Sequence, residues 1–313
     1  MSRGAAVLLT AILLLGWFAA RSAALTAFPS FVDEAFHINF GRIVLETGPF
    51  ARSEEGRQFV VWLYVLFGAP VNAPLWTARA ANLIMLLPGF AAVIGAARRL
   101  SNRWGALFAG LLLIFSPYHQ FFERLALADP VSASAVALAV YFAARLKHRT
   151  SLTDAALCGI MLFVAVGAKV SALPYFAIPV FAVLALRRNR SGVRWGFAAL
   201  AVGAGLTAAY LSILFWRGYN PFFYLQTGAP RLQADRPEQH RRHNAERWSA
   251  ISSFRRRSCW WFPSSALVVR RRFFLPLCLI APLLVLWLSP RRDSRHLIAP
   301  MTLLLLGRGG RPG

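Results

Sequence analysis

Long apolar stretches separated by short polar segments dominate this 313-residue sequence. The first stretch follows Arg3 and covers residues 5–20, and most later ones approach the ~20 residues that a helix needs to cross a bilayer. We expect further spans near 76–97, 104–122, 125–146, 152–168, 171–187, 195–216 and 273–289, and a shorter apolar run at 297–306 closes the sequence. Because helices satisfy their own backbone hydrogen bonds in lipid, the pattern predicts an all-α, polytopic transmembrane helical bundle of about eight or nine spans.

Two of the apolar runs need separate interpretation. The small residues at 20–24 would suit the cleavage site of a signal peptide, but the polytopic chain that follows favours an uncleaved first span. Residues 59–67 are apolar but too short to cross a membrane. We therefore expect an outer loop at 29–75 that carries interfacial helices.

Composition supports a membrane protein and weakens the nucleic-acid alternative. The sequence is 57% hydrophobic and 15% charged, whereas ordinary soluble domains contain roughly 25% charged residues. Its net charge of +23 could indicate nucleic-acid binding, but the arginines flank apolar runs and form no separate basic module. Such flanking clusters are typical of cytoplasmic loops, so the lipid bilayer is the expected partner and nucleic acid is not.

The positions of charged residues predict how the bundle is oriented. If the spans alternate, three basic loops fall on one side, which the positive-inside rule identifies as the cytoplasm. Most carboxylates then fall on the other side, including a group in the first outer loop. The basic loops contain Arg98, Arg99 and Arg103, then Arg145, Lys147 and Arg149, and finally Arg187, Arg188, Arg190 and Arg194. We expect a multi-pass protein of the cell (inner) membrane.

The pattern divides the chain into three parts. Residues 1–216 form the main transmembrane module, 217–272 are polar and arginine-rich, and 273–313 hold one or two C-terminal spans. Arginines at 255–257 and 270–272 interrupt what should be another span near 248–269. A frameshifted or truncated gene product would explain this interruption; an intact reading frame at the locus would remove that hypothesis.

The adjacent acids Asp33 and Glu34 are the first candidates for chemistry. A carboxylate beside apolar side chains becomes a stronger base, which suits abstraction of a proton from a hydroxyl group. The alternative is an acid pair that stabilises a helix N-terminus. His37 would share the same helical face, so these three residues are weak candidates for a divalent metal site; the alternative for His37 is a hydrogen-bonded loop histidine. No metal or other cofactor is predicted with certainty.

A second group of candidates lies farther along the chain. Arg124 and Asp129 flank the start of a span, and Asp129 is also suited to capping that helix. Lys169 breaks the positive-inside trend, so it could bind an anionic group such as a phosphate, or it could be a snorkelling lysine. Arg295, before the last apolar run, could be a second phosphate contact.

These features, in this order, resemble the GT-C membrane glycosyltransferases, particularly the aminoarabinose-transferase and protein O-mannosyltransferase type. The resemblance covers roughly residues 5–216. It is carried by the acidic pair Asp33-Glu34, the stretch from Arg124 to Asp129 and Pro130, the lysine before a proline-containing span, and an arginine-aromatic-apolar-proline stretch. The last two features comprise Lys169 and Pro174, and Arg295, His296 and Pro300.

The resemblance implies an inverting glycosyltransferase that takes a sugar from a polyprenyl-phosphate carrier. It implies Asp33 as general base, with Lys169 and Arg295 contacting the carrier phosphate. Glu34 and Asp129 are further catalytic candidates, and Arg124 is a further candidate for the phosphate contact. The acceptor would be a glycan, lipid or protein on the non-cytoplasmic (periplasmic or extracellular) face. Two other classes remain open, a transporter or flippase and a non-catalytic, truncated membrane protein. A transporter would favour ionisable residues near the bilayer midplane and repeated halves, which the sequence lacks.

Overall fold

The computed structural model describes residues 3–50, 57–146, 151–186 and 190–219. This part of the chain is helical throughout, with no strand among the described residues. The helices are α1 (Arg3–Ser22), α2 (Val32–Thr47), α3 (Gln58–Leu66), α4 (Pro74–Leu100), α5 (Arg103–Phe115), α6 (Pro117–Glu123), α7 (Ala128–Leu146), α8 (Leu152–Ala168), the 3₁₀ helix η1 (Val170–Phe176), α9 (Ala177–Leu186) and α10 (Arg190–Trp216). The predicted spans at 273–289 and 297–306 lie outside the described residues.

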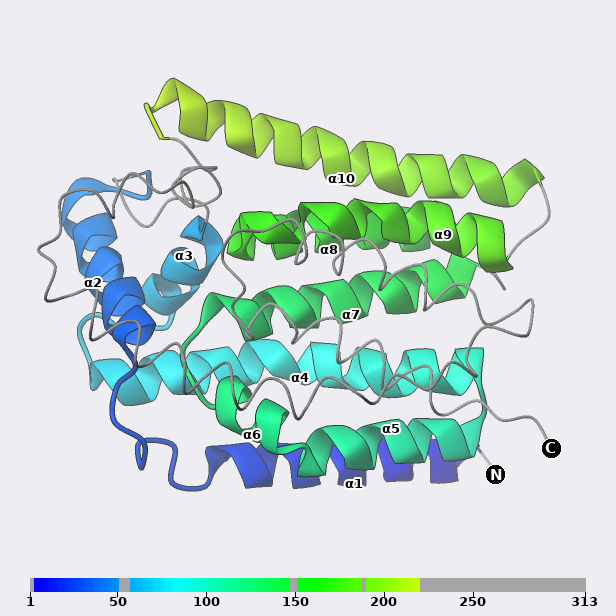
Figure 1. The fold of residues 1–313 in the computed structure, drawn as a ribbon, viewed down its shortest axis with the longest axis horizontal. Helices are drawn as coiled ribbons and strands as arrows, with labels where there is room; N and C mark the ends of the chain where they lie inside the picture. Colours follow the sequence, from blue (N-terminus) through cyan, green and yellow to red (C-terminus); the bar gives the residue numbers. More distant parts are fainter. Residues whose placement is uncertain (1–2, 51–56, 147–150, 187–189, 220–313) are drawn as a thin grey trace, which may run out of the picture.

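The long helices lie side by side, and α2 and α3 sit across one end of the bundle (Figure 1). We call this the α2–α3 end. The junctions α4–α5, α7–α8 and α9–α10 all lie at the opposite end, which we call the basic end (Figure 1). The described helix ends that flank the three basic loops therefore lie at one end of the bundle, while the membrane side on which that end lies stays a prediction.

Three described helices are each long and apolar enough to cross a membrane. They are α1, α4 and α10, and the pair α5 and α6 would make a fourth span although it bends by 63°. The shorter apolar stretches Leu152–Ala168 and Val170–Ala182 lie in the bundle beside them. The expected class, a polytopic helical membrane protein, is confirmed, whereas the expected number of spans stays a prediction.

Local sequence explains where several helices begin. Pro74 and Pro117 stand in the first turns of α4 and α6, where the missing N–H of proline costs nothing. Asn102 caps α5, because its side-chain oxygen accepts a 2.9 Å hydrogen bond from the backbone N–H of Gly105. Ser116 ends α5 and caps α6, so the apolar run at 104–122 is two helices rather than one.

The core lies where α4, α7 and α8 meet. Helix α7 is rich in alanine, which lets its neighbours approach closely. Hydroxyl groups hold the helices together: Ser134 Oγ donates to the carbonyl of Met85 on α4, and Ser132 Oγ donates to that of Ala165 on α8, both at 3.0 Å. These bonds cross from α7 to both of its main neighbours, so α7 is the centre of the bundle.

Helix α10 packs against α8 through glycines. A Cβ on Gly159 would lie 2.4 Å from the carbonyl oxygen of Ala199, and one on Gly203 would lie 2.9 Å from the carbonyl oxygen of Gly159. Both distances are too short for real Cβ atoms, so the crossing requires small residues, as is common between membrane helices.

We predict that Gly159→Ala destabilises the protein, because its Cβ would push against the backbone of α10. Overpacking of this kind costs about 1–3 kcal/mol. The matched control is Gly205→Ala on α10, where the added Cβ meets nothing within 4 Å. Thermal unfolding of the detergent-solubilised variants, followed by tryptophan fluorescence, measures the difference. Equal unfolding temperatures for the two variants would contradict the tight crossing.

Candidate functional site

The acidic pair lies in the first turn of α2, at the α2–α3 end. The two side chains differ in environment, since Glu34 is completely buried and Asp33 is half-buried. Glu34 also helps to start the helix, because its Oε2 accepts a 2.8 Å hydrogen bond from the backbone N–H of Phe31. The two adjacent carboxylates therefore differ: Glu34 is enclosed by the protein, whereas Asp33 is partly accessible.

Glu34 forms a buried, two-pronged ion pair with Arg79 of α4. Nε of Arg79 lies 2.8 Å from Oε1 of Glu34, and Nη2 lies 2.7 Å from Oε2. Both side chains are fully buried. Oε1 also accepts a 2.6 Å hydrogen bond from the backbone N–H of Ala126. With four N–H groups directed at its two oxygens, Glu34 acts in this structure as an anchor and is not poised as a base.

The guanidinium of Arg79 also holds the segment that joins α1 to α2. Nη1 donates to the carbonyls of Leu25 at 2.8 Å and Phe28 at 3.0 Å, and Nη2 donates to that of Pro29 at 3.0 Å. A buried carbonyl without a donor is costly, so these bonds fix the path of the chain just before Asp33. The ion pair thereby positions Asp33 without using it.

Asp129 and Lys169 form an ion pair at the same end of the bundle. Asp129 lies in the first turn of α7, and Lys169 ends α8. Nζ of Lys169 donates to Oδ1 of Asp129, and both side chains are largely buried. Asp129 thus holds a cation rather than only capping its own helix.

Further hydrogen bonds connect α2, α3 and the start of α7. The bond from Ala126 to Glu34 brings the segment before Asp129 next to the first turn of α2. Asn82 Nδ2 donates to the carbonyl of Leu125 at 2.7 Å, and the hydroxyl of Tyr64 lies 3.5 Å from Asn82 Oδ1. Burial, and then the negative charge of Glu34, raises the pKa of Tyr64 well above its usual value, so this phenol stays neutral.

The candidate metal ligands do not come together. His37 is buried, its Nδ1 donates to the backbone carbonyl of Asp33, and its ring contacts the ring of Tyr64 edge-on. The carboxylate of Glu34 is held by Arg79. Across the described ranges, no group of three or more His, Cys, Asp or Glu side chains is arranged to hold a metal ion.

Arg124 contacts the end of α1 rather than an open surface. Its Nη2 donates to the carbonyls of Ala23 and Ala24, and its guanidinium lies 5.4 Å from the ring centre of Phe28. Ala24 has a φ of 49°, which non-glycine residues rarely adopt. This arrangement makes Arg124 a support for the α1–α2 connection, while its predicted contact with a phosphate stays a prediction. Arg295 lies outside the described residues.

Sequence reasoning missed a second buried ion pair. Nε of Arg21 lies 3.1 Å from Oε2 of Glu123, which also accepts a 3.0 Å hydrogen bond from Trp17 Nε1. Arg21 also donates to the carbonyls of Leu113 and Ile114, at the end of α5. An arginine directly after an apolar run at the expected outer side was the available signal, because it breaks the positive-inside trend.

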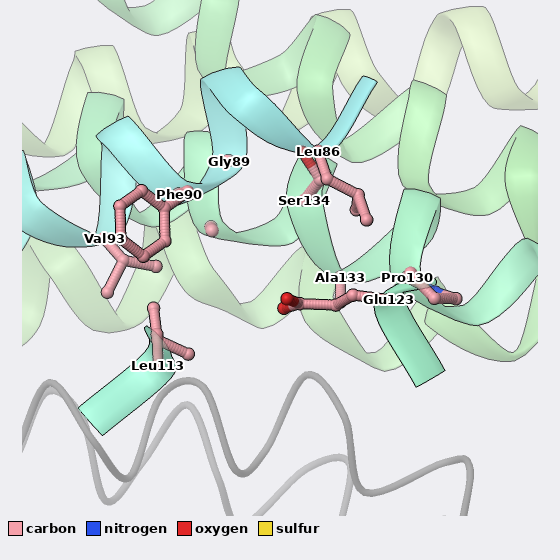
Figure 2. Close-up of a pocket in the computed structure, with 10 residues that line it drawn as sticks. Leu86, Gly89, Phe90, Val93, Leu113, Glu123, Pro130, Ala133 and Ser134 are labelled. Carbon is pink, nitrogen blue, oxygen red and sulfur yellow. The ribbon is translucent and has the colours of Figure 1, made fainter. Parts of the chain in front are cut away.

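A small cavity of about 30 Å³ lies beside this second pair. Glu123 extends into it, opposite Leu113 of α5 and Phe90 and Val93 of α4 (Figure 2). Such a volume holds roughly two water molecules at most, so it is too small for a sugar. The described cavity is thus a place where Glu123 could stay hydrated rather than a substrate pocket.

Comparisons with known proteins identify the fold. Neither a protein-family model nor a curated protein matches the chain. The solved structures that match include ArnT from Cupriavidus metallidurans in the apo state, with a TM-score of 0.65 and 18% identity, covering 98% of this chain and 59% of that one. ArnT bound to undecaprenyl phosphate matches with a TM-score of 0.64 and 18% identity, covering 99% of this chain and 60% of that one.

The chain therefore spans about three fifths of the length of ArnT. At this level of identity the likeness concerns the fold, and it confirms the expected GT-C membrane glycosyltransferase fold. The activity of this chain does not follow from its fold and has to be argued from the residues at the α2–α3 end.

We predict that Arg79→Met strongly destabilises the protein, because it leaves the buried carboxylate of Glu34 without its cation. Breaking a buried pair in this way costs about 3–5 kcal/mol. The control is Arg42→Met on α2, because this exposed arginine makes a 3.2 Å hydrogen bond to the Pro70 carbonyl. Thermal unfolding and protease protection of residues 25–31 are the measurements. The double variant Glu34→Gln, Arg79→Met should recover part of the loss; no recovery would contradict the pairing.

Proposed function

We propose that this chain is a membrane glycosyltransferase that takes a sugar from a polyprenyl-phosphate carrier. The proposal rests first on the fold shared with ArnT, one structure of which holds undecaprenyl phosphate. A donor of this kind stays in the bilayer, so an enzyme that uses it must be embedded there too. The observation that carries the proposal is that a half-buried carboxylate, Asp33, and a cation, Lys169, lie at one end of such a bundle.

Asp33 is the proposed general base. Its neighbour Glu34 is committed to Arg79, whereas Asp33 lies half-buried in the first turn of a helix whose start is fixed by that pair. In the proposed step, Asp33 takes the proton of an acceptor hydroxyl, and the hydroxyl oxygen bonds to the anomeric carbon. The bond from that carbon to the carrier phosphate breaks, and polyprenyl phosphate leaves with the electron pair. Attack opposite the leaving group inverts the anomeric centre.

Lys169 is the proposed contact for the leaving phosphate. A phosphate needs a cation more than it needs an acid, because it is weakly basic. Asp129 holds the ammonium of Lys169 in place, and this ammonium carries a positive charge and three N–H groups, the chemistry that a phosphate attracts. Asp129 is accordingly a positioning residue. Arg124 supports the α1–α2 connection, and Arg295 stays a proposed second phosphate contact.

The proposed reaction takes place on the periplasmic or extracellular face. The positive-inside rule supports this side for the α2–α3 end, because the described helix ends that flank the basic segments lie at the opposite end. The acceptor would then be a glycan, lipid or protein exposed on that face. Labelling that found residue 33 on the cytoplasmic side would exclude this orientation.

We predict that Asp33→Asn abolishes sugar transfer, because an amide cannot accept the hydroxyl proton. A general base contributes about 10²–10⁴-fold, so the rate should fall at least ~100-fold. Membranes that contain each variant are incubated with a panel of labelled undecaprenyl-phosphate sugars, and labelled product is counted. Glu46→Gln is the matched control, because Glu46 is an exposed acid on the same helix. Equal transfer by Asp33→Asn and wild type would remove Asp33 as the base.

The same assay distinguishes the other classes. Movement of the labelled donor across the membrane without any glycosyl product would favour a flippase. Insertion into the membrane with neither product nor movement, for every donor in the panel, would favour a non-catalytic protein. Neither outcome is expected if the proposal holds.

We predict that Lys169→Met weakens the use of donor, whereas Lys169→Arg retains much of it. A hydrogen bond to a charged group contributes about 1.5–3 kcal/mol, which corresponds to a loss of roughly 10- to 100-fold in kcat/KM for the donor. Lys169→Met also leaves the carboxylate of Asp129 without its cation. The double variant Asp129→Asn, Lys169→Met removes that unpaired charge and so isolates the loss of the lysine. Unchanged kcat/KM in both Met variants would exclude Lys169 as a phosphate contact.

A further inference from the structure

A tyrosine ring packs against α4 near the basic end of the bundle. It belongs to Tyr141 of α7, and it occupies the place where a side chain on Gly95 would be. A Cβ on Gly95 would lie 2.7 Å from Cε2 of Tyr141, so only glycine leaves room for the ring. Helices α4 and α7 are therefore in direct contact at this point.

Two arginines from different helices meet at this ring. The guanidinium carbon of Arg99 on α4 lies 5.5 Å from the ring centre of Tyr141, and that of Arg145 on α7 lies 5.8 Å from it. Arg99 is exposed, and the side chain of Arg145 is 30% exposed. Two like charges thus share one aromatic ring, at the surface of the bundle's basic end.

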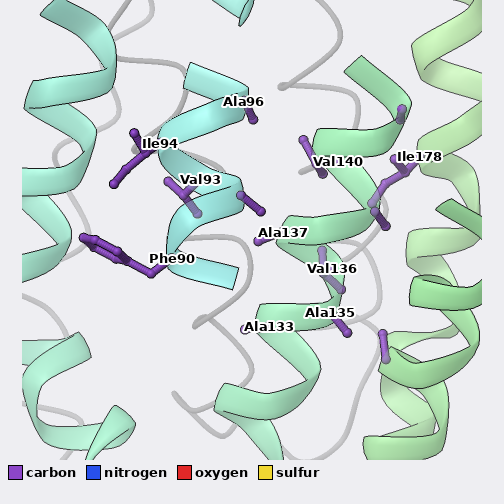
Figure 3. Close-up of a cluster of buried hydrophobic side chains, with 14 of the residues drawn as sticks. Phe90, Val93, Ile94, Ala96, Ala133, Ala135, Val136, Ala137, Val140 and Ile178 are labelled. Atoms are coloured by element: carbon purple, nitrogen blue, oxygen red, sulfur yellow. The ribbon is translucent and has the colours of Figure 1, made fainter. Parts of the chain in front are cut away.

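The parallel course of the two helices explains this meeting. Figure 3 shows α4 and α7 side by side and running in the same direction, with Phe90 and Ala133 toward one end and Ala96 and Val140 toward the other. Arg99 is four residues beyond Gly95, and Arg145 is four residues beyond Tyr141. Each arginine therefore stands one helical turn past the contact between ring and glycine.

The described charges at this ring do not balance, because two arginines face one carboxylate. Asp154 of α8 lies 3.1 Å from Nε of Arg145 and is the one carboxylate in the three basic loops. Those loops contain three, three and four basic residues at 98–103, 145–154 and 187–194. Asp154 fixes the direction of Arg145, and no described ion pair engages Arg99. The site thus keeps a net positive charge.

We propose that Arg99, Tyr141 and Arg145 form a binding site for the headgroup of an anionic phospholipid. A phosphodiester has two oxygens that can accept hydrogen bonds from two guanidinium groups, and it neutralises their repulsion. The site lies at the ends of membrane helices, where headgroups are present and the acyl chains can stay in the bilayer. Basic pockets between transmembrane helices are a known way to bind such headgroups.

Ordinary reasons for arginines at a helix end do not account for the arrangement. A helix C-terminus favours basic residues, and cytoplasmic loops retain them, but neither effect needs two helices to present guanidiniums to one ring. Nor does either effect need a glycine opposite that ring. The proposal is independent of the proposed glycosyltransferase activity, because it concerns the other end of the bundle.

The test measures lipid binding by the purified full-length chain in neutral detergent. Fluorescent phosphatidylglycerol is titrated onto wild type, Arg99→Gln, Arg99→Lys and Arg103→Gln. Loss of one arginine near an anionic lipid is expected to raise the Kd about fivefold. We expect this for Arg99→Gln, a smaller rise for Arg99→Lys, and little change for Arg103→Gln. Arg103 is the control because it is exposed at the same end but lies over Trp104 instead.

Competitors decide which ligand the site takes. Unlabelled phosphatidylglycerol should displace the probe, whereas phosphatidylcholine and millimolar inorganic phosphate should not do so efficiently. Equal Kd increases for Arg99→Gln and Arg103→Gln would overturn the proposal, because the attraction would then be diffuse. Displacement by inorganic phosphate alone would show an anion site rather than a lipid site and would also overturn it.

Discussion

The buried pair of Arg79 and Glu34 is the interaction on which the α2–α3 end depends. An isolated charge is very costly in an apolar interior, and unpaired backbone carbonyls there are costly too. Arg79 removes both costs. Two of its N–H groups donate to the carboxylate of Glu34, and its other N–H groups donate to the carbonyls of Leu25, Phe28 and Pro29. Glu34 in turn accepts from Ala126, so one pair fixes the chain before Asp33 and the chain before Asp129.

Two other arginines donate to backbone carbonyls in the same way. The last carbonyls of a helix lack partners within the helix, and water is scarce at membrane depth. Arg21 supplies donors to the end of α5, and Arg124 supplies donors to the turn that follows α1. Arginine suits this work because its planar fork has five donors. These arginines can lie on the expected outer side, against the positive-inside trend, because they donate to the protein's own backbone carbonyls.

The helices could be predicted from sequence, because apolar runs of near-span length have few other stable structures in lipid. The break at Ser116 was missed because the apolar run continues across it, although a serine before a proline is a local signal for a helix start. Asp33 and Glu34 were found because they are adjacent. That Glu34 is fully buried against Arg79 while Asp33 is half-buried could not be predicted, because it depends on Arg79, which is 45 residues from Glu34 in the sequence. The pairs of Arg21 with Glu123 and of Lys169 with Asp129 were missed for the same reason.

The buried ion pairs differ in their cation, which is arginine in two of them and lysine in the third, and this difference bears on which cation could also bind a ligand. Arg21 and Arg79 spread several donors over carbonyls and a carboxylate, so a ligand could recruit them only by dismantling the backbone arrangement that they hold. Lys169 differs, because a compact ammonium on a flexible stem can rotate its donors toward a new anion while it keeps Asp129. A bundle that uses arginine for its framework therefore keeps its adaptable cation, Lys169, at the same end as Asp33. This contrast is the physical reason for proposing Lys169, and not an arginine of the framework, as the contact for the donor phosphate.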